Sequence, residues 1–584
     1  MARMQENIVH NAPLEIEDED APDFWDESTD LLVVGFGVAG AAAALEAREQ
    51  GAEVIVLDRF AGGGATAYSG GVYYAGNTQY QRDAGFDDSA EEMFKYLSID
   101  VGDAVKPETL RRFCDDSPDN IAWITRHGVP FEGSAYLGKR VFPPAGKRLY
   151  YSGNEKVPAY AARAKPAPRG HQTVGKGNFC GYAFFGALEA ATYRSGAKVL
   201  THSWATRLVR NHAGRIVGVE MRGFVDPADQ KRHQKLYSKI NPHKPFGSAS
   251  AEKAIARARA MEAQYSVRRL IRARRGVVLS TGGFIYNLEM LNAYLPDLAG
   301  TYKTLMRLGS MGCDGSGIAM GQSVGASVAY MERPFISHLL NPPDAKTYGL
   351  IVNGSGDRFI NEDIYCSVLG DAILAQPGMK AWLVLDHKTF WTVVRQSLAN
   401  KEGTFTLFGV PTLLNILLGR TRRARSLEKL GARLGIPPGR LSATVARFND
   451  HSLAGRPDPL GKNAEYVRPL GEGPYWALDI SLRNVFAFSG GFTLGGLKVD
   501  EVRGTVVDTT GHAIEGLYGA GRAAVGLCSN GYFSGLSLAD GVFSGRRAAR
   551  DALAPPAKAM PAAKTKPATP RRRAARGRLV DRPA

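Results

Sequence analysis

A glycine pattern near the amino terminus could bind a phosphate-containing ligand. Gly35, Gly37 and Gly40 have the spacing GxGxxG, directly after an apolar segment and before an alanine-rich one. Glycines with this spacing permit a tight turn and let a pyrophosphate approach the exposed N–H groups of a helix N-terminus. Asp58 follows 23 positions after Gly35, where a carboxylate can hold ribose hydroxyl groups and disfavours a 2′-phosphate. The pattern predicts an ADP-containing cofactor, whereas a lone glycine turn would only pack a helix on a strand.

The segments around this turn indicate a βαβ unit. Residues 30–34 and 53–57 are short apolar runs typical of buried strands, and residues 41–50 between them favour a helix. Because strands joined through a helix are parallel, we expect an α/β fold with a Rossmann-like parallel sheet. A hairpin is expected near residues 205–219, and another strand at residues 274–279.

Changes in composition along the chain predict its domain organisation. Mixed helical and loop texture replaces sheet texture in the middle of the chain, and glycine-rich strands then return. The expected parts are an acidic leader at 1–29, a first cofactor-binding part at 30–285 with a basic insertion at 225–275, a substrate-binding cap domain at 286–455, a second cofactor-binding part at 456–554 and a disordered basic tail at 555–584.

The net charge of +16 comes from two of these parts. Residues 225–275 hold 13 Lys and Arg against four acids, and residues 555–584 hold nine against one, so the remainder is nearly neutral. Neither part interleaves aromatic residues with its basic residues. We therefore expect nonspecific attraction to polyanions and no specific nucleic-acid partner.

The cysteines and the apolar segments restrict the compartment. Five widely spaced cysteines without a Cys-x-x-Cys pair support neither a disulfide framework nor a metal site. The acidic leader lacks the order of a signal peptide, and no apolar run is long enough to span a bilayer. We expect a cytoplasmic protein. The apolar run 405–418, followed by four arginines up to Arg425, fits either peripheral contact with the inner membrane face or a buried cap helix.

Six further segments resemble the FAD-dependent fumarate reductase and 3-ketosteroid dehydrogenase superfamily. They are 62–71 (GGGATAYSGG), 280–283 (STGG), 312–317 (GCDGSG), 358–362 (RFINE), 495–496 (GG) and 517–522 (LYGAGR). Their order matches that of the superfamily, and the resemblance runs from about residue 30 to 552. It implies a FAD-binding domain with an inserted α+β cap domain. Residues 63–69 contain no His, so we expect FAD to be held without a covalent bond.

The resemblance also implies which residues contact FAD. The expected cofactor residues are Gly35, Gly37, Val38, Ala39, Gly40, Asp58, Arg59, Gly63, Ala65, Thr66, Ser69, Gly70, Gly71, Ala205, Thr281, Gly282, Gly283, Asp314, Gly521, Arg522, Ser537 and Leu538.

The sequence departs from fumarate reductases where those enzymes hold a dicarboxylate. They need a His near the late Gly-Gly strand and an Arg in an Asn-Arg-Leu-Gly-Gly-like turn. Here residues 490–496 read GGFTLGG without a His, and residues 530–535 read NGYFSG with Tyr532 in place of the arginine. A buried dianion without its cations would lose charge-assisted hydrogen bonds. A neutral ketone is therefore favoured as substrate.

The same turn resembles that of ketosteroid dehydrogenases, especially those acting at the 4,5-bond of 3-oxo-5α-steroids. The resemblance implies that the Tyr532 hydroxyl and the Leu536 N–H donate to the ketone oxygen while Tyr365 removes a proton. Because a phenol with a pKa of about 10 is a poor base at neutral pH, we expect Ser534 to support Tyr365. The expected reaction is FAD-dependent desaturation of a steroid-like cyclic ketone beside its carbonyl, with an unidentified electron acceptor.

Five other residues have two interpretations each. Tyr73, Tyr74, Phe335 and Phe492 either line an apolar steroid slot or pack in the core. His338 either faces the flavin or is a structural histidine, and the structural interpretation is favoured because no partner can be named.

Two alternative functions stay open at this point. A flavin-dependent reductase of fumarate or of an enone would have the same fold and run the reaction in the opposite direction. A membrane- or polyanion-binding flavoprotein without turnover would use the basic parts instead.

Overall fold

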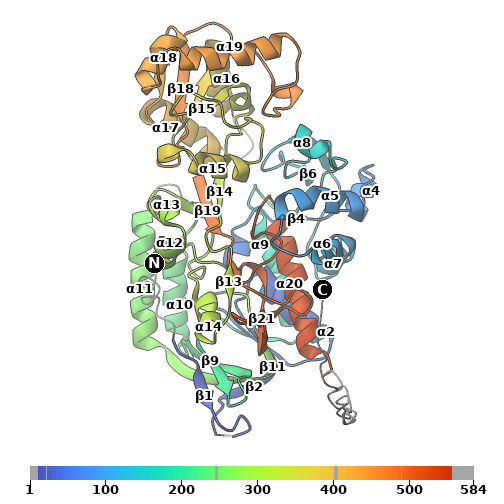
Figure 1. Ribbon diagram of the computed structural model, residues 1–584. Helices are drawn as coiled ribbons and strands as arrows, with labels where there is room; N and C mark the ends of the chain where they lie inside the picture. Colours follow the sequence, from blue (N-terminus) through green and yellow to red (C-terminus); the bar gives the residue numbers. More distant parts are fainter. Residues whose placement is uncertain (1–10, 22, 244–247, 400–404, 488, 556–584) are drawn as a thin grey trace, which may run out of the picture. The chain divides into compact units, whose positions relative to one another are not determined.

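A nine-stranded sheet forms the centre of the cofactor domain in the computed structural model, which describes residues 11–21, 23–243, 248–399, 405–487 and 489–555 (Figure 1). Five neighbouring strands run parallel, and in spatial order they are β22 (Ala513–Gly519), β11 (Val267–Leu279), β2 (Glu27–Val34), β3 (Val54–Leu57) and β8 (Lys198–Leu200). This arrangement confirms the predicted Rossmann-like parallel sheet. All but the first residue of the predicted tail 555–584 lie outside the described residues.

The βαβ unit forms because its strands are apolar and its helix is small-sided. The last four residues of β2 and all of β3 are buried on both faces. Helix α2 (Val38–Glu49) carries six alanines on its buried faces and packs against α20 (Leu536–Leu553) (Figure 1). A Cβ at Gly545 would lie 2.3 Å from the Ala39 carbonyl oxygen, so this close helix contact depends on glycine.

Two strands begin earlier than predicted. β2 starts at Glu27 and β11 at Val267, because β11 pairs with β2 on one edge and with β10 (Ile216–Gly223) on the other. The predicted hairpin is confirmed as β9 (Ser203–Asn211) and β10. Residues 267–275 therefore belong to the central sheet.

The acidic leader contributes to the same sheet. Its strand β1 (Leu14–Ile16) pairs with β9 in parallel. Two acids of the leader form ion pairs with arginines of the sheet, Glu15 with Arg210 and Asp20 with Arg272. Asp30, directly after the leader, pairs with Arg274. Part of the positive charge that the sequence places in the basic insertion is thus compensated within the fold.

A second, antiparallel sheet with helices forms the cap. Its strands, in spatial order, are β15 (Leu350–Asn353), β16 (Ala381–Leu385), β18 (Tyr475–Asp479) and β17 (Arg422–Ala424). Its helices are α15 (Cys366–Leu374), α16 (His387–Leu398), α17 (Val410–Leu418), α18 (Leu427–Leu434) and α19 (Arg440–Leu453). Beside it, β14 (Pro334–His338) pairs with β19 (Ser489–Thr493), which also pairs with β12 (Met306–Arg307). The expected α+β cap is confirmed.

A third sheet supports the cofactor domain from the side. In spatial order it contains β4 (Val72–Tyr74), β7 (Gly170–Gln172), β6 (Leu149–Tyr151) and β5 (Ala135–Lys139). All five cysteines lie in the described residues, and each is a buried free thiol. Within the described ranges, no helix is both long and apolar enough to cross a membrane.

Candidate active site

A large cavity opens at the carboxyl ends of the parallel strands. Its walls come from the glycine turn after β2, from residues that follow β3, β11 and β22, and from the turn before α20. Phe335 of β14 and Tyr365, directly before α15, close it on the cap side. Ligands of open α/β sheets bind at this edge.

The glycine turn is shaped for a pyrophosphate. A Cβ at Gly35 would lie 2.6 Å from the Ser280 carbonyl oxygen, and one at Gly40 would lie 1.9 Å from the Gly35 carbonyl oxygen. Helix α2 begins directly behind the turn, where Gly37 supplies no capping side chain and the Val38 N–H donates to the Thr66 hydroxyl at 3.0 Å. Thr281, whose backbone lies beside Gly35, borders the cavity, and its hydroxyl is buried and has no hydrogen-bond partner within the described residues. A helix N-terminus and a free hydroxyl donor together suit a bound diphosphate.

Most of the predicted cofactor residues border the cavity. They are Gly35, Gly37, Val38, Ala39, Asp58, Arg59, Ala65, Thr66, Ser69, Gly70, Ala205, Thr281, Gly282, Gly521, Arg522, Ser537 and Leu538. Gly40, Gly63, Gly71, Gly283 and Asp314 do not border it. The four glycines pack closely one layer behind the wall, and Asp314 binds Arg59. We interpret these five as residues that shape the wall.

Asp58 organises the loop beside the glycine turn. One carboxylate oxygen accepts the N–H of Phe36, at 2.8 Å, and the other accepts the N–H of Phe60, also at 2.8 Å. Burial raises the pKa of Asp58, and these backbone hydrogen bonds oppose the shift. Sequence reasoning assigned Asp58 to ribose alone, but the structure also gives it this local structural task.

An aromatic wall stands on the cap side of the cavity. The rings of Phe335 and Phe492 stack with centroids 4.4 Å apart, and the Tyr532 ring meets Phe335 edge-on at 4.6 Å. The Arg522 guanidinium lies 4.4 Å from the Phe492 ring centroid. These four side chains border the cavity. Such a wall fits a flat apolar molecule with few polar groups.

Three tyrosines gather behind and within this wall. Tyr365 and Tyr532 border the cavity, while Tyr150 of β6 lies behind them and donates its hydroxyl to the Val141 carbonyl oxygen at 3.0 Å. Burial raises the pKa of each phenol above its ordinary value, most strongly for Tyr365. Cys366 hydrogen-bonds to Tyr365 and, when ionised, would raise the pKa of all three phenols further. Sequence reasoning missed Tyr150 and Cys366, because nothing in the spacing links β6 to the start of α15.

The structure gives two catalytic candidates hydrogen bonds that the sequence did not predict. Ser534 borders the cavity, but its hydrogen bond acts on Tyr150 and lowers the pKa of that phenol, rather than that of Tyr365. Leu536 does not border the cavity, and its N–H donates to the Phe533 carbonyl oxygen at 3.2 Å.

Three other candidates belong to the core. Tyr73 and Tyr74 of β4 are fully buried, and Tyr74 meets the Phe533 ring edge-on at 4.6 Å. His338 hydrogen-bonds to the Ser489 hydroxyl at 2.8 Å, and burial lowers its pKa to about 3. Neither tyrosine nor His338 borders the cavity, whereas Phe335 and Phe492 do. The structural interpretation of His338 is the correct one.

The sequence profile of the FAD binding domain family matches residues 30–535. The chain belongs to this family. Its cofactor is FAD, and the cavity residues above are the ones that would hold it. The glycine turn, the α2 N-terminus and the Thr281 hydroxyl fit its diphosphate.

Several relatives of this flavoprotein cover nearly its whole length. A 3-oxo-5-alpha-steroid 4-dehydrogenase from Comamonas testosteroni is 36% identical over 510 residues, which are 85% of this chain and 93% of the relative. A vinyl phenol reductase from Lactiplantibacillus plantarum is 24% identical over 564 residues, covering 90% and 96% of the two chains. The solved structure of a 3-ketosteroid-delta4-(5alpha)-dehydrogenase from Rhodococcus jostii RHA1 in complex with 4-androstene-3,17-dione superposes with a TM-score of 0.75 and 31% identity, covering 93% and 99%.

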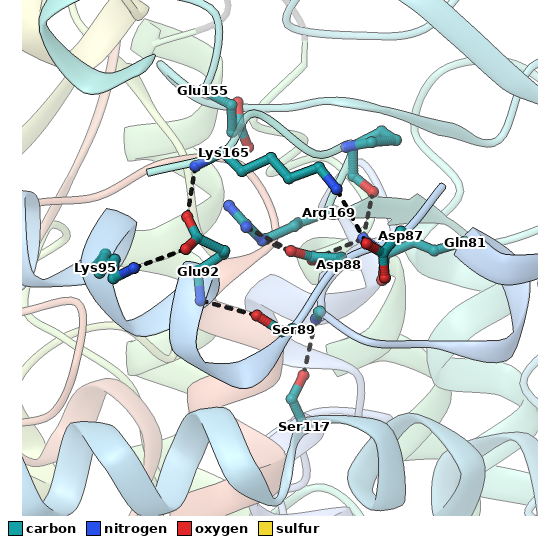
Figure 2. A network of polar contacts seen from close by, with 12 residues as sticks. Gln81, Asp87, Asp88, Ser89, Glu92, Lys95, Ser117, Glu155, Lys165 and Arg169 are labelled. Atoms are coloured by element: carbon teal, nitrogen blue, oxygen red, sulfur yellow. Dashed lines mark hydrogen bonds and ion pairs between the residues drawn. The ribbon is translucent and has the colours of Figure 1, made fainter. Parts of the chain in front are cut away.

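Asn154 and Glu155 connect the tyrosine cluster of this flavoprotein to a network of polar side chains around Arg169 (Figure 2). The Asn154 side-chain oxygen accepts the backbone N–H of Tyr365 at 2.8 Å. The neighbouring Glu155 accepts the N–H of Gly153 at 2.9 Å and the Tyr74 hydroxyl at 3.3 Å. Figure 2 shows Glu155 beside Arg169, whose guanidinium binds both carboxylate oxygens of Asp88 at 2.6 and 2.8 Å. Arg169 is therefore already paired, and burial raises the pKa of Glu155 to about 7.

Glu155→Gln should make the free energy of unfolding of this flavoprotein depend less on pH. With a pKa near 4.5 when unfolded and about 7 when folded, Glu155 contributes stability at low pH that is lost as the pH rises through 7. The loss amounts to about 3 kcal/mol, because one pKa unit corresponds to about 1.4 kcal/mol. Urea unfolding measures the free energy of unfolding of both proteins at pH 5 and pH 8. The difference between variant and wild type should shift in favour of the variant by about 3 kcal/mol from pH 5 to pH 8. An equal difference at both pH values would contradict the assignment.

Proposed function

We propose that this flavoprotein is an oxidoreductase that desaturates a 3-ketosteroid-like cyclic ketone beside its carbonyl, at the 4,5-bond. The observation that carries the proposal is the phenol of Tyr532, set at the end of an aromatic slot formed by Phe335 and Phe492. Among the described wall residues the cations are Arg59, which two carboxylates neutralise, His243 when protonated, and Arg522. A dicarboxylate would find few cations here, whereas a flat ketone finds ring surfaces and one hydroxyl donor.

The Tyr532 hydroxyl is suited to bind the ketone oxygen. Burial raises its pKa, so the phenol keeps its proton and can donate at neutral pH. A donor on that oxygen stabilises the negative charge that develops there when the adjacent carbon loses a proton. We propose the Leu536 N–H as a second donor to this oxygen, for which its hydrogen bond to the Phe533 carbonyl oxygen at 3.2 Å would have to be exchanged.

Tyr365 is the group that takes the proton. Its side chain borders the same cavity from the cap side, and the hydrogen bond from its N–H to Asn154 fixes its backbone. The substrate loses a proton to Tyr365 and a hydride, and the electron pair of the broken C–H bond forms the new double bond. FAD, when bound, accepts the hydride. Because burial raises the pKa of Tyr365, its phenolate form becomes available only as the pH rises.

Incubation with a panel of saturated and unsaturated 3-ketosteroids and an artificial electron acceptor tests the proposal. We expect a product two mass units lighter than a 3-oxo-5α-steroid, with the new double bond at the 4,5 position. Desaturation at the 1,2 position would show that the 4,5-bond is not the bond that the enzyme desaturates. No conversion of any cyclic ketone would refute the proposed function.

The reverse reaction, reduction of an activated double bond, is the second candidate. The raised pKa of Tyr365 favours it, since a protonated phenol is ready to donate a proton. The vinyl phenol reductase among the relatives shows that the fold also occurs in reductases. Chemically reduced protein that is reoxidised by an enone, together with no turnover of saturated ketones, would support this direction.

We further propose that the protein is cytoplasmic and binds peripherally to the inner face of the membrane. At the end of α17, Leu417 and Leu418 are 77% and 64% exposed, and Arg420, Arg422 and Arg423 follow on the exposed surface. The inner side of the same helix is buried at Pro411. Apolar residues beside exposed arginines suit an anionic leaflet, in which a sterol-like substrate dissolves.

Vesicle flotation at low salt should show binding to vesicles with anionic lipid and none to neutral vesicles. The double variant in which both Leu417 and Leu418 are replaced by Asp should not bind these vesicles, because carboxylates do not insert into the apolar part of an anionic leaflet. Leu453→Asp serves as a control, since Leu453 is 74% exposed and has no arginine cluster beside it in sequence. Equal flotation of the wild type and the double variant would exclude this contact.

A further inference from the structure

The helical insertion, α10 (Pro227–Tyr237) and α11 (Ser248–Tyr265), reaches the cofactor cavity. The two helices pack on each other beside the central sheet (Figure 1). Pro242 and His243, which follow α10, border the cavity. The insertion is therefore part of the site, and not only a basic appendage as its composition indicates.

An arginine of the cavity wall is held by the insertion. Arg59 follows Asp58 at the end of β3, and both border the cavity. Its Nε and Nη2 donate to the two carboxylate oxygens of Glu262 on α11, at 2.8 and 2.6 Å. Its Nη1 donates to Asp314 at 2.6 Å. Two carboxylates on one guanidinium fix the plane of Arg59 and leave no net positive charge for a phosphate.

An aromatic stack joins α10 to the same wall. The Tyr237 ring lies parallel to that of Phe60, with centroids 4.1 Å apart, and His233 stacks beside Phe60 at 5.1 Å. Phe60 borders the cavity and lies next to Arg59 in sequence. Two consecutive wall residues are thus fixed by two different helices of the insertion.

A second layer of hydrogen bonds fixes the carboxylate that holds Arg59. The His233 Nε2 lies 3.1 Å from Glu262, and its Nδ1 lies 3.0 Å from Nδ1 of His202. Hydrogen bonds from His233 and Arg59 lower the pKa of Glu262 to about 2, although burial opposes them. Glu262 is therefore ionised at neutral pH.

We propose that the helical insertion binds the adenosine half of FAD, with Glu262 and Tyr237 as the residues that position Arg59 and Phe60 against it. The place of these wall residues, directly after the carboxylate at the end of the second parallel strand, is where a ribose and its base lie in such folds. The neutralised guanidinium and the fixed ring offer flat faces to an uncharged nucleoside. The residues of the aromatic wall would hold the flavin half.

Titration of the apo-protein with FAD and with FMN tests this assignment, because FMN lacks the adenosine half. Glu262→Gln removes half of the charge pairing on Arg59, and Tyr237→Leu removes the stack without touching the ion pair. Each variant should bind FAD at least tenfold more weakly and FMN as well as wild type does. Glu252→Gln is the matched control, since it removes the same charge from the same helix at an ion pair with Arg307, and neither Glu252 nor Arg307 borders the cavity.

Thermal unfolding separates cofactor binding from a purely structural role. A positioning role predicts that the variants lose part of the increase in Tm that saturating FAD produces, while the Tm of the apo-protein changes little. Equal losses of FAD and FMN affinity, or unchanged FAD affinity in both variants, would overturn the proposal. If Glu262→Gln does not fold, Tyr237→Leu decides the outcome alone.

Discussion

Tyr532→Phe should lower kcat/KM for a saturated 3-ketosteroid by about a hundred- to a thousand-fold, the usual cost of removing one donor to a developing oxyanion. The variant loses only the hydroxyl, so the ring should still meet Phe335 and Phe492 edge-on. The aromatic slot and the glycine turn are then unchanged, and the protein should purify yellow with its FAD. Steady-state kinetics together with the flavin absorbance of the purified variant check both expectations.

Tyr150→Phe is the matched control for this experiment. It removes a phenol from the same cluster, but that phenol points to the Val141 carbonyl oxygen and does not border the cavity. Its turnover should stay within a few-fold of wild type. If Tyr532→Phe retains near-normal turnover, or if both variants lose activity equally, Tyr532 does not bind the substrate carbonyl.

Tyr365→Phe should lower kcat by about a hundred- to ten-thousand-fold, because it removes the group that accepts the substrate proton. The wild-type rate should rise with pH, since burial raises the pKa of Tyr365 and only its deprotonated form acts as a base. The residual rate of the variant should lack this rise. The pH profile of kcat therefore distinguishes a proton acceptor from a residue that only packs in the site.

Steroid binding provides the control for Tyr365. Because the phenylalanine ring fills the same space, the dissociation constant for a product steroid should change little in the variant. A rate that is independent of pH in the wild type would assign the proton to another group. A variant that fails to bind steroid would give Tyr365 a packing role instead.

The cofactor half of the site was largely predictable because it depends on local sequence. Gly35, Gly37 and Asp58 lie within one βαβ unit, so their spacing alone places them at one edge of the sheet. Glu262 and Tyr237 were not predictable as site residues. They contact Arg59 and Phe60 from helices about 200 residues away in sequence. Glu262 is moreover one of few acids in a strongly basic segment, so the composition does not indicate that its carboxylate is buried.

The catalytic half was predictable only through the resemblance. It correctly brings Tyr532 and Tyr365 to one cavity, although the chain separates them by a large part of the cap. The role of the Leu536 N–H stays a prediction, and its hydrogen bond to Phe533 inside the turn before α20 is not visible in a motif. Tyr73 and Tyr74 were candidates for the slot because aromatic type does not tell which face of a strand is buried, and both lie in the core.

The central claim is that the cavity binds an uncharged ketone and removes two hydrogens from it. Anaerobic mixing of the oxidised holoenzyme with a saturated 3-oxo-5α-steroid, and separately with succinate, tests it most directly. We expect the steroid to bleach the flavin absorbance at a rate at least as high as kcat, and succinate to leave the absorbance unchanged. Bleaching by succinate, with no response to the steroid, would contradict it.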